Sequence, residues 1–263
     1  MMKFKYLLVA LPLAILAGSC KKELDFSYHD IDPIPVAEAY LSQDGTELTL
    51  TLTTPMDEPM DLRRLKDAEV ALYNIDQDDW VVLEADRSGI YRSPIPGIPG
   101  DHYQMIVERE GELYMASGLM YGPARIVSAE FGWIKMPYDY VAVLQVEFED
   151  NDDDINSCYW VRLLRNGEPY MWQATTDAMA VDGVVRISFM TSRKDLDEEE
   201  DDTVLRYGDE VTVIVQQISR DMFDYIMAIG NNSNGARMWQ GNHCLGFFLP
   251  SWRTEYIVEF TLQ

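Results

Sequence analysis

The chain has 263 residues, and 47% of them are hydrophobic, which is enough to build one large sandwich or two modest domains. Its 45 acidic residues outnumber its 21 basic residues and give a formal net charge of −24 at pH 7. A field of this sign repels phosphate backbones and anionic lipid headgroups, so it excludes nucleic acid as a partner and polybasic docking to a membrane.

Residues 1–19 have the features of a cleaved signal peptide. Lys3 and Lys5 precede an apolar run over residues 6–16. This run is well short of the roughly 20 apolar residues that a membrane-spanning helix needs. We therefore expect the segment to be removed rather than kept as a membrane span.

Cys20 follows the small residues Ala17, Gly18 and Ser19, in the pattern of a lipobox. The pattern is slightly irregular, because the usual leucine stands one place early, at Leu16. The alternative is an ordinary signal with an incidental cysteine. We expect cleavage before Cys20 and lipid attachment at Cys20, where two or three acyl chains would hold the protein to a membrane.

Residues 20–35 are polar, contain prolines and have no apolar period, so they are expected to form a lipidated tether. An N-terminal β-sandwich domain is predicted over residues 36–123. Leucine alternates with threonine over residues 46–54, which is typical of a half-buried strand, and Glu110-Gly111 predicts a hairpin turn. Four further strands are expected, at residues 68–75, 80–85, 102–109 and 113–117.

A C-terminal β-rich domain is predicted over residues 124–263. Asn166-Gly167 is the strongest hairpin signal in the chain, and one helix is expected between the N-cap Ser219 and Gly230. Its strands are expected at residues 138–149, 157–165, 184–190, 210–218 and 254–262. The predicted fold class is therefore mainly β, with two Ig-like or β-sandwich-type domains and one short helix in the second.

Two cysteines remain after Cys20, and both lie in strand-like segments. The compartment expected for a lipoprotein permits disulfides. A bridge between Cys158 and Cys244 and a pair of free buried thiols are both compatible with the sequence.

The alternating acidic residues of segment 150–156 have the spacing of a calcium loop. The match fails at the sixth and twelfth positions, which are Ile155 and Val161 instead of glycine and glutamate. A solvated turn between two strands is the favoured interpretation, and no metal site is predicted.

The sequence contains no nucleophile elbow, phosphate loop or dinucleotide fingerprint, so no catalytic or cofactor-binding residue is assigned. A glycosidase carboxylate pair stays open, because it is defined by separation in space. Aromatic residues gather in segments 133–140, 159–160, 170–172 and 247–252. They suit either stacking platforms for sugars or the core and edges of a sandwich, and the second interpretation is favoured.

Several segments, spread over nearly the whole chain after the signal, have an order and spacing that match a known family. They are residues 16–23, 67–70, 91–116, 156–159, 207–211, 218–225 and 241–248. Together they resemble the Bacteroidetes outer-membrane lipoprotein family known as domain of unknown function 4249. It implies a β-sandwich lipoprotein of the outer membrane, commonly associated with TonB-dependent transporters and without established catalysis.

The expected function is that of a non-enzymatic accessory or binding subunit, anchored by lipid to the outer membrane and facing the periplasm or the cell surface. A fimbrial or adhesive surface subunit and a carbohydrate-active enzyme are the alternatives. Asp202-Thr203-Val204 also matches a short acceptor pattern for O-glycosylation in these bacteria, which makes Thr203 a candidate modification site.

Overall fold

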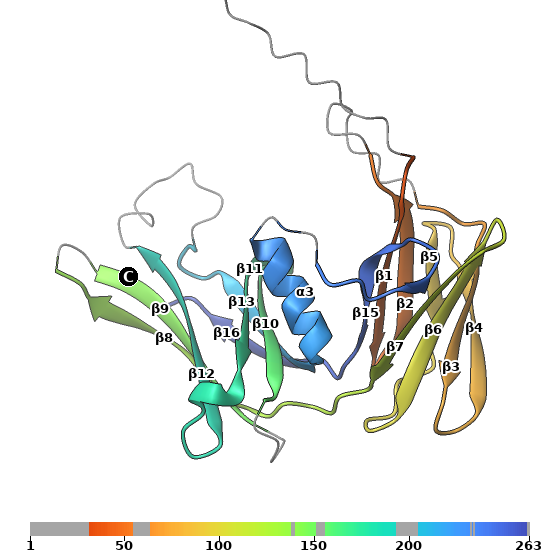
Figure 1. The fold of residues 1–263 in the computed structure, drawn as a ribbon. Coiled ribbons are helices and arrows are strands. Elements are labelled where there is room, and N and C mark those ends of the chain that lie inside the picture. Colours follow the sequence, from red (N-terminus) through yellow and green to blue (C-terminus); the bar gives the residue numbers. More distant parts are fainter. Residues whose placement is uncertain are drawn as a thin grey trace, which may run out of the picture. The chain divides into compact units, whose positions relative to one another are not determined.

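The computed structural model describes residues 32–54, 64–137, 140–150, 156–192, 205–231, 233 and 235–261. In these residues the protein is mainly β, as predicted, with its strands in three sheets and one α-helix (Figure 1). The signal peptide, Cys20 and residues 21–31 of the expected tether lie outside the described residues.

The first sandwich is built from two layers that share a strand. The strands β1, β2 and β5 form one layer, and β4, β3, β6 and β7 form the other. Strand β4 pairs with β3 along most of its length and with β5 at its end, so the two layers join at this corner. The strands are β1 (Pro35–Ser42), β2 (Gly45–Leu52), β3 (Glu69–Asn74), β4 (Asp79–Ala85), β5 (Ile90–Ser93), β6 (His102–Arg109) and β7 (Glu112–Leu119).

The predicted alternation of β2 accounts for its place in this sandwich. Leu48 and Leu50 are fully buried in the core, whereas Thr49 and Thr51 point to the other face and are partly exposed. The turn between β6 and β7 is also as predicted, because Glu110 and Gly111 have positive φ angles of 53° and 82°.

A second sandwich packs a three-stranded sheet, in the order β12-β9-β8, on a four-stranded sheet, in the order β11-β10-β13-β16. Asn166 and Gly167 form the predicted hairpin turn between β10 and β11, with φ angles of 51° and 87°. A short 3-10 helix, η1 (Asp177–Met179), precedes β12. The strands are β8 (Ile126–Lys135), β9 (Tyr140–Glu149), β10 (Cys158–Arg165), β11 (Glu168–Thr176), β12 (Val184–Ser192), β13 (Glu210–Ile218) and β16 (Thr254–Glu259).

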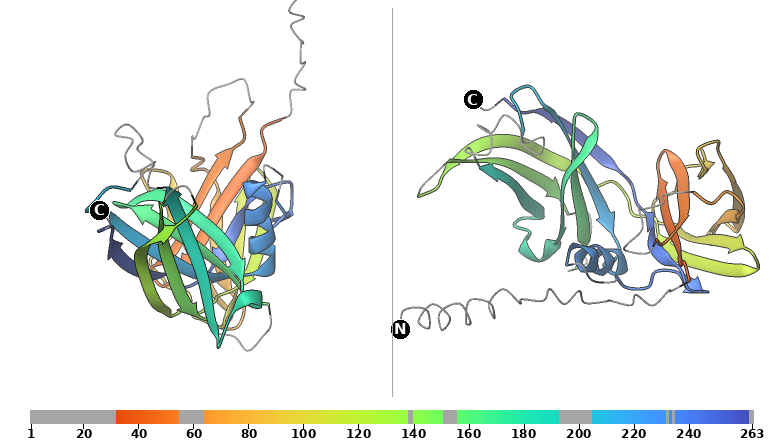
Figure 2. Two further views of the ribbon diagram at one scale, coloured as in Figure 1. Left: turned by 90° about the vertical axis from the view of Figure 1, so that its left-hand side faces the viewer. Right: turned by 90° about the horizontal axis from the view of Figure 1, so that it is seen from above.

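The segment between β13 and β16 forms an insert that returns to the first sandwich. It begins with α3 (Arg220–Gly230), whose N-cap Ser219 accepts a hydrogen bond of 3.1 Å from the Met222 amide, as the sequence predicts. Strand β14 (Gln240–Gly241) then pairs with β7, and β15 (Leu245–Pro250) pairs in parallel with β1. Figures 1 and 2 show β15, in blue, beside β1, in orange-red.

The insert covers both outer edges of the first sandwich, whose strand order becomes β14-β7-β6-β3-β4-β5-β2-β1-β15. Exposed strand edges present unpaired backbone groups that other chains can pair with, so covering them protects the sheet. The expected division between residues 123 and 124 is therefore not a division of the sheets. The strand β15 comes after it in sequence but lies in the sheet before it. No helix among the described residues is long and apolar enough to cross a bilayer.

Candidate functional site

Alternation along β10 places two large polar side chains on the outer face of the second sandwich. Val161 and Leu163 are buried in the core between the sheets. Trp160 and Arg162 therefore point to the opposite face, where α3 and the first sandwich lie. The neighbouring strand β13 is buried on both faces and contributes Gln216 beside Arg162.

Ser251 joins this face to the first sandwich. Its amide donates a hydrogen bond of 2.9 Å to the carbonyl oxygen of Leu41 in β1. Its hydroxyl donates one of 2.7 Å to the carbonyl oxygen of Gln217 in β13. Two further bonds, of 2.8 and 2.9 Å, tie the side-chain amide of Gln43 to the backbone of Arg253. These contacts fix the β1–β2 hairpin against the loop that follows β15.

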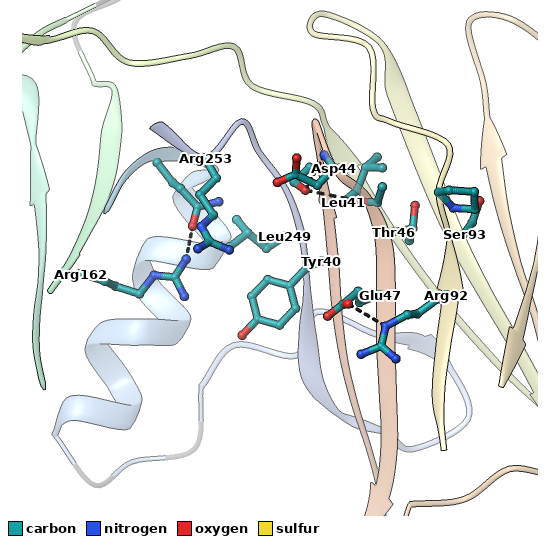
Figure 3. Close-up of a pocket in the computed structure, with 14 residues that line it drawn as sticks. Tyr40, Leu41, Asp44, Thr46, Glu47, Arg92, Ser93, Arg162, Leu249 and Arg253 are labelled. Carbon is teal, nitrogen blue, oxygen red and sulfur yellow. Dashed lines mark hydrogen bonds and ion pairs between the residues drawn. The ribbon is translucent and has the colours of Figure 1, made fainter. Parts of the chain in front are cut away.

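A hollow of about 520 Å³ lies among these elements. The β1–β2 hairpin, the end of β5 and Pro94 after it form one side, and β10, β13, the end of β15 and the loop after it form the other. Figure 3 shows Arg162, Arg253 and Tyr40 approaching the same space from these different elements. Its polar lining comprises Tyr40, Ser42, Asp44, Thr46, Glu47, Arg92, Ser93, Arg162, Gln216 and Arg253.

Two of the three arginines of the hollow have carboxylate partners. Arg92 pairs with Glu47 at 2.7 Å and also with Asp86. Arg253 pairs with Glu255 at 2.5 Å. These ion pairs are partly exposed, so each contributes little to stability.

The third arginine, Arg162, has no carboxylate partner among the described residues. Its guanidinium lies over the ring of Trp160, 4.2 Å from the ring centre, and donates one hydrogen bond through Nη2 to Oε1 of Gln216. Burial lowers its pKa, and nearby Arg253 lowers it further, whereas Tyr40 and Glu255 have the opposite effect. The hollow therefore contains a half-buried positive charge whose hydrogen-bonding capacity is largely unused.

A second surface lies on the outer face of the first sandwich. Strand register brings Val82, Ala71, Ile106 and Met115 into one row across β4, β3, β6 and β7. Val82 is 73% exposed. Beside this row Tyr73 and Trp80 stack with their ring centres 4.4 Å apart, and exposed glutamates border it at positions 69, 84 and 108.

Of the predicted site residues, the structure describes only Cys158 and Cys244. Cys20 and Thr203 lie outside the described residues. Cys158 and Cys244 are free and buried, and no disulfide joins them. Cys158 lies in the hydrophobic cluster beside α3, and Cys244 lies in the core of the first sandwich. Of the two possibilities that the sequence leaves open, the structure has the pair of free buried thiols.

The acidic segment 150–156 is described only at its ends. Asp150 accepts a hydrogen bond from the hydroxyl of Tyr159, and the amide of Asn156 donates one of 2.9 Å to Asp177. Within the described part of the chain, no three His, Cys, Asp or Glu side chains gather closely enough to hold a metal ion.

Sequence reasoning did not single out Arg162, Arg253 or Gln216. The signal in the sequence is indirect, because Trp160 lies in one of the aromatic segments that suit a sugar platform. In the structure Trp160 supports Arg162, while Tyr159 and Phe248 belong to the sandwich cores.

The sequence matches no known protein-family profile and no curated protein. Among solved structures, it is similar to a DUF4785 family protein from Legionella pneumophila, with 13% identity over 70% of this chain and a TM-score of 0.24. The chain spans about half of that protein, 52% of its length. It is also similar to the FN1–FN3 domains of chicken CNTN1, with 12% identity, a TM-score of 0.21 and coverage of 81% of this chain and 67% of that one. These likenesses assign no function.

Proposed function

We propose that this protein is a lipid-anchored, non-enzymatic binding subunit of a complex at the outer membrane. The observation that carries the binding role is the hollow between the β1–β2 hairpin and the outer face of β10 and β13. It is lined by Arg162, whose charge has no carboxylate partner in the described part of the chain. Anchoring is supported by the lipobox that ends at Cys20. Acyl chains there would confine the binding sites to a membrane surface and raise their effective concentration near other membrane proteins.

The proposed protein partner is a TonB-dependent transporter, as the resemblance to domain of unknown function 4249 implies. The row formed by Val82, Ala71, Ile106 and Met115, with Trp80 beside it, supports a docking role for the first sandwich. Exposed apolar patches with a polar border are typical of protein interfaces, and aromatic residues often contribute most to their affinity. The bordering glutamates favour a partner surface with basic residues around an apolar centre.

Anchoring is tested by Cys20→Ala in cells. The variant should leave the membrane fraction, and metabolic labelling with an azido fatty acid should mark only the parent protein. Labelling of the Cys20→Ala protein would contradict the proposed anchor.

The partner is tested by gentle detergent extraction, capture through a C-terminal tag and mass spectrometry. We expect a transporter to be recovered with the parent protein and largely lost with Val82→Glu, which places a charge in the apolar row. The matched control is Val181→Glu, at a valine that is 56% exposed in the second sandwich. Recovery of pilus subunits would favour the adhesive alternative, and recovery of no membrane protein would count against the proposal.

A further inference from the structure

The hollow at Arg162 has a lining that indicates the chemical class of its ligand, which the proposed function does not name. The only hydrogen bond that this guanidinium makes within the described residues is the one to Gln216. A guanidinium has five N–H donors in a planar fork that matches a carboxylate. Asp44 and Glu47 also line the hollow, but neither pairs with Arg162, and the carboxylate that raises the pKa of Arg162 is that of Glu255.

The hollow holds the cation in a fixed position. The Trp160 ring lies under the guanidinium at 4.2 Å, and Gln216, which is 3% exposed, holds Nη2 from the side. A buried charge is costly unless it is paired and hydrogen-bonded, and Nε of Arg162 is buried without a hydrogen-bond partner among the described residues. Figure 3 shows the Arg162 side chain extending from β10 toward Tyr40 and Arg253 at the hollow. A site that is organised in advance loses little entropy when a ligand binds.

The remaining lining favours a ligand that also bears hydroxyl groups. Thr46, Ser93 and Tyr40 line the hollow and have hydroxyl groups. The hydroxyl oxygen of Thr46 is buried with no hydrogen-bond partner among the described residues, and that of Ser93 accepts a hydrogen bond from the Ile95 amide. Buried polar atoms usually have hydrogen-bond partners, so this hydroxyl suits a polar group of a ligand. A volume of about 520 Å³ is within the range of sites for small molecules.

Charge decides between the anions that an arginine can bind. The protein has a net charge of −24, and Asp44 and Glu47 lie in the same hollow. A dianion such as phosphate is repelled more strongly by this field than a monoanion. We propose that the hollow binds a small, hydroxylated organic monocarboxylate, such as a sugar acid, with its carboxylate on Arg162 and Arg253 and its hydroxyls toward Thr46 and Ser93.

The test is calorimetric titration of the purified full chain in detergent with sodium D-glucuronate, D-galacturonate and D-gluconate. D-glucose serves as the neutral counterpart and inorganic phosphate as the competing anion. We expect at least one sugar acid to bind, and glucose and phosphate to bind at least tenfold more weakly. The absence of binding by all three acids, or tighter binding of phosphate, would overturn the proposal.

Variants assign the binding to the hollow. Arg162→Met keeps the length of the side chain and removes its charge, and we expect it to weaken binding at least tenfold, or about 1.4 kcal/mol. Arg253→Met is a second variant on a different element, and circular dichroism melting checks that both remain folded. The matched control is Arg186→Met, whose arginine pairs with Glu147 on the other sheet of the second sandwich and should leave binding unchanged. Unchanged binding by both hollow variants would refute the assignment.

This inference rests on the proposed binding role, and the two can fail separately. Membrane release of Cys20→Ala and capture of a transporter do not depend on the titration. If anchoring and capture succeed while no acid binds, only the ligand assignment is wrong.

Discussion

The indole Nε1 of Trp239 donates a hydrogen bond of 3.0 Å to the carbonyl oxygen of Ala37, which lies 202 residues earlier in the chain. The whole Trp239 side chain is buried in the core of the first sandwich. The insert of the second sandwich is therefore attached to the first by both a buried ring and a backbone partner. This attachment positions β15, and through it the loop that contributes Arg253 to the hollow.

Trp239→Ala is expected to destabilise the protein by about 3–5 kcal/mol, because it removes a large buried ring and leaves the Ala37 carbonyl oxygen without this donor. Denaturant unfolding followed by circular dichroism measures the change. The control is Trp80→Ala, whose side chain is 56% exposed and which should cost much less. Equal losses for the two variants would show that the insert does not depend on Trp239.

Gly246→Ala is expected to weaken the pairing of β15 with β1. A Cβ atom at this position would lie 2.1 Å from the carbonyl oxygen of Ala37, and the φ angle of Gly246 is +96°. Gly111→Ala is the matched control, because Gly111 also has a positive φ angle, +82°, but its added Cβ would meet nothing within 4 Å. The difference between the two variants in unfolding free energy isolates the steric clash from the backbone strain. Equal costs for the two variants would contradict this account.

Local patterns predicted much of the fold. The leucines of β2 alternate with threonines, and Asn166-Gly167 has the backbone angles that its hairpin needs, so these elements follow from neighbouring residues alone. The N-cap Ser219 is local as well. The strands β6 and β13 have the bounds that the sequence predicts, His102–Arg109 and Glu210–Ile218.

The features of the fold and the site that the sequence does not predict depend on residues far apart in the chain. The residues of strand β15 are mostly apolar and do not alternate with polar ones. Its partner β1 lies far earlier in the chain, so no local signal assigns β15 to the first sandwich. Arg162 occupies an outward position of β10, so the sequence alone predicts a solvent-exposed side chain. In the structure β1 and the loop after β15 lie over it. The charge of the site is visible in the sequence, but its burial is a tertiary property.

The two buried thiols are expected to be unreactive in the folded protein. Burial raises the pKa of Cys244 to about 12 and also raises that of Cys158. The thiolate is the reactive form, and at pH 8 almost none is present at Cys244, while burial also disfavours it at Cys158. Iodoacetamide followed by intact-mass analysis should add nothing to these residues under native conditions, and it should label both after denaturation in guanidinium. The recovery of a peptide in which Cys158 is bridged to Cys244 would contradict the structure.

Asp209 is expected to make stability depend on pH on the acidic side. This carboxylate is 8% exposed and accepts hydrogen bonds from the Arg206 amide at 2.6 Å, Arg165 Nε at 2.7 Å and Asn166 Nδ2 at 2.8 Å. Burial acts to raise its pKa, but these hydrogen bonds and the charge of Arg165 together hold the pKa below the ordinary value of 3.8.

Because the pKa is lower in the folded state, the charged form stabilises the fold above pH 3.8, and this contribution is lost as the pH falls through the folded pKa. Asp209→Asn should therefore cost about 1–3 kcal/mol at pH 7, and the difference from the parent protein should shrink as the pH is lowered below about 4. The control is Asp224→Asn, which breaks an exposed pair with Arg220 and should cost much less, because solvent screens this pair. Urea unfolding between pH 3 and pH 7 measures both variants. A constant difference between Asp209→Asn and the parent protein over this range would show that Asp209 acts through packing rather than through its charge.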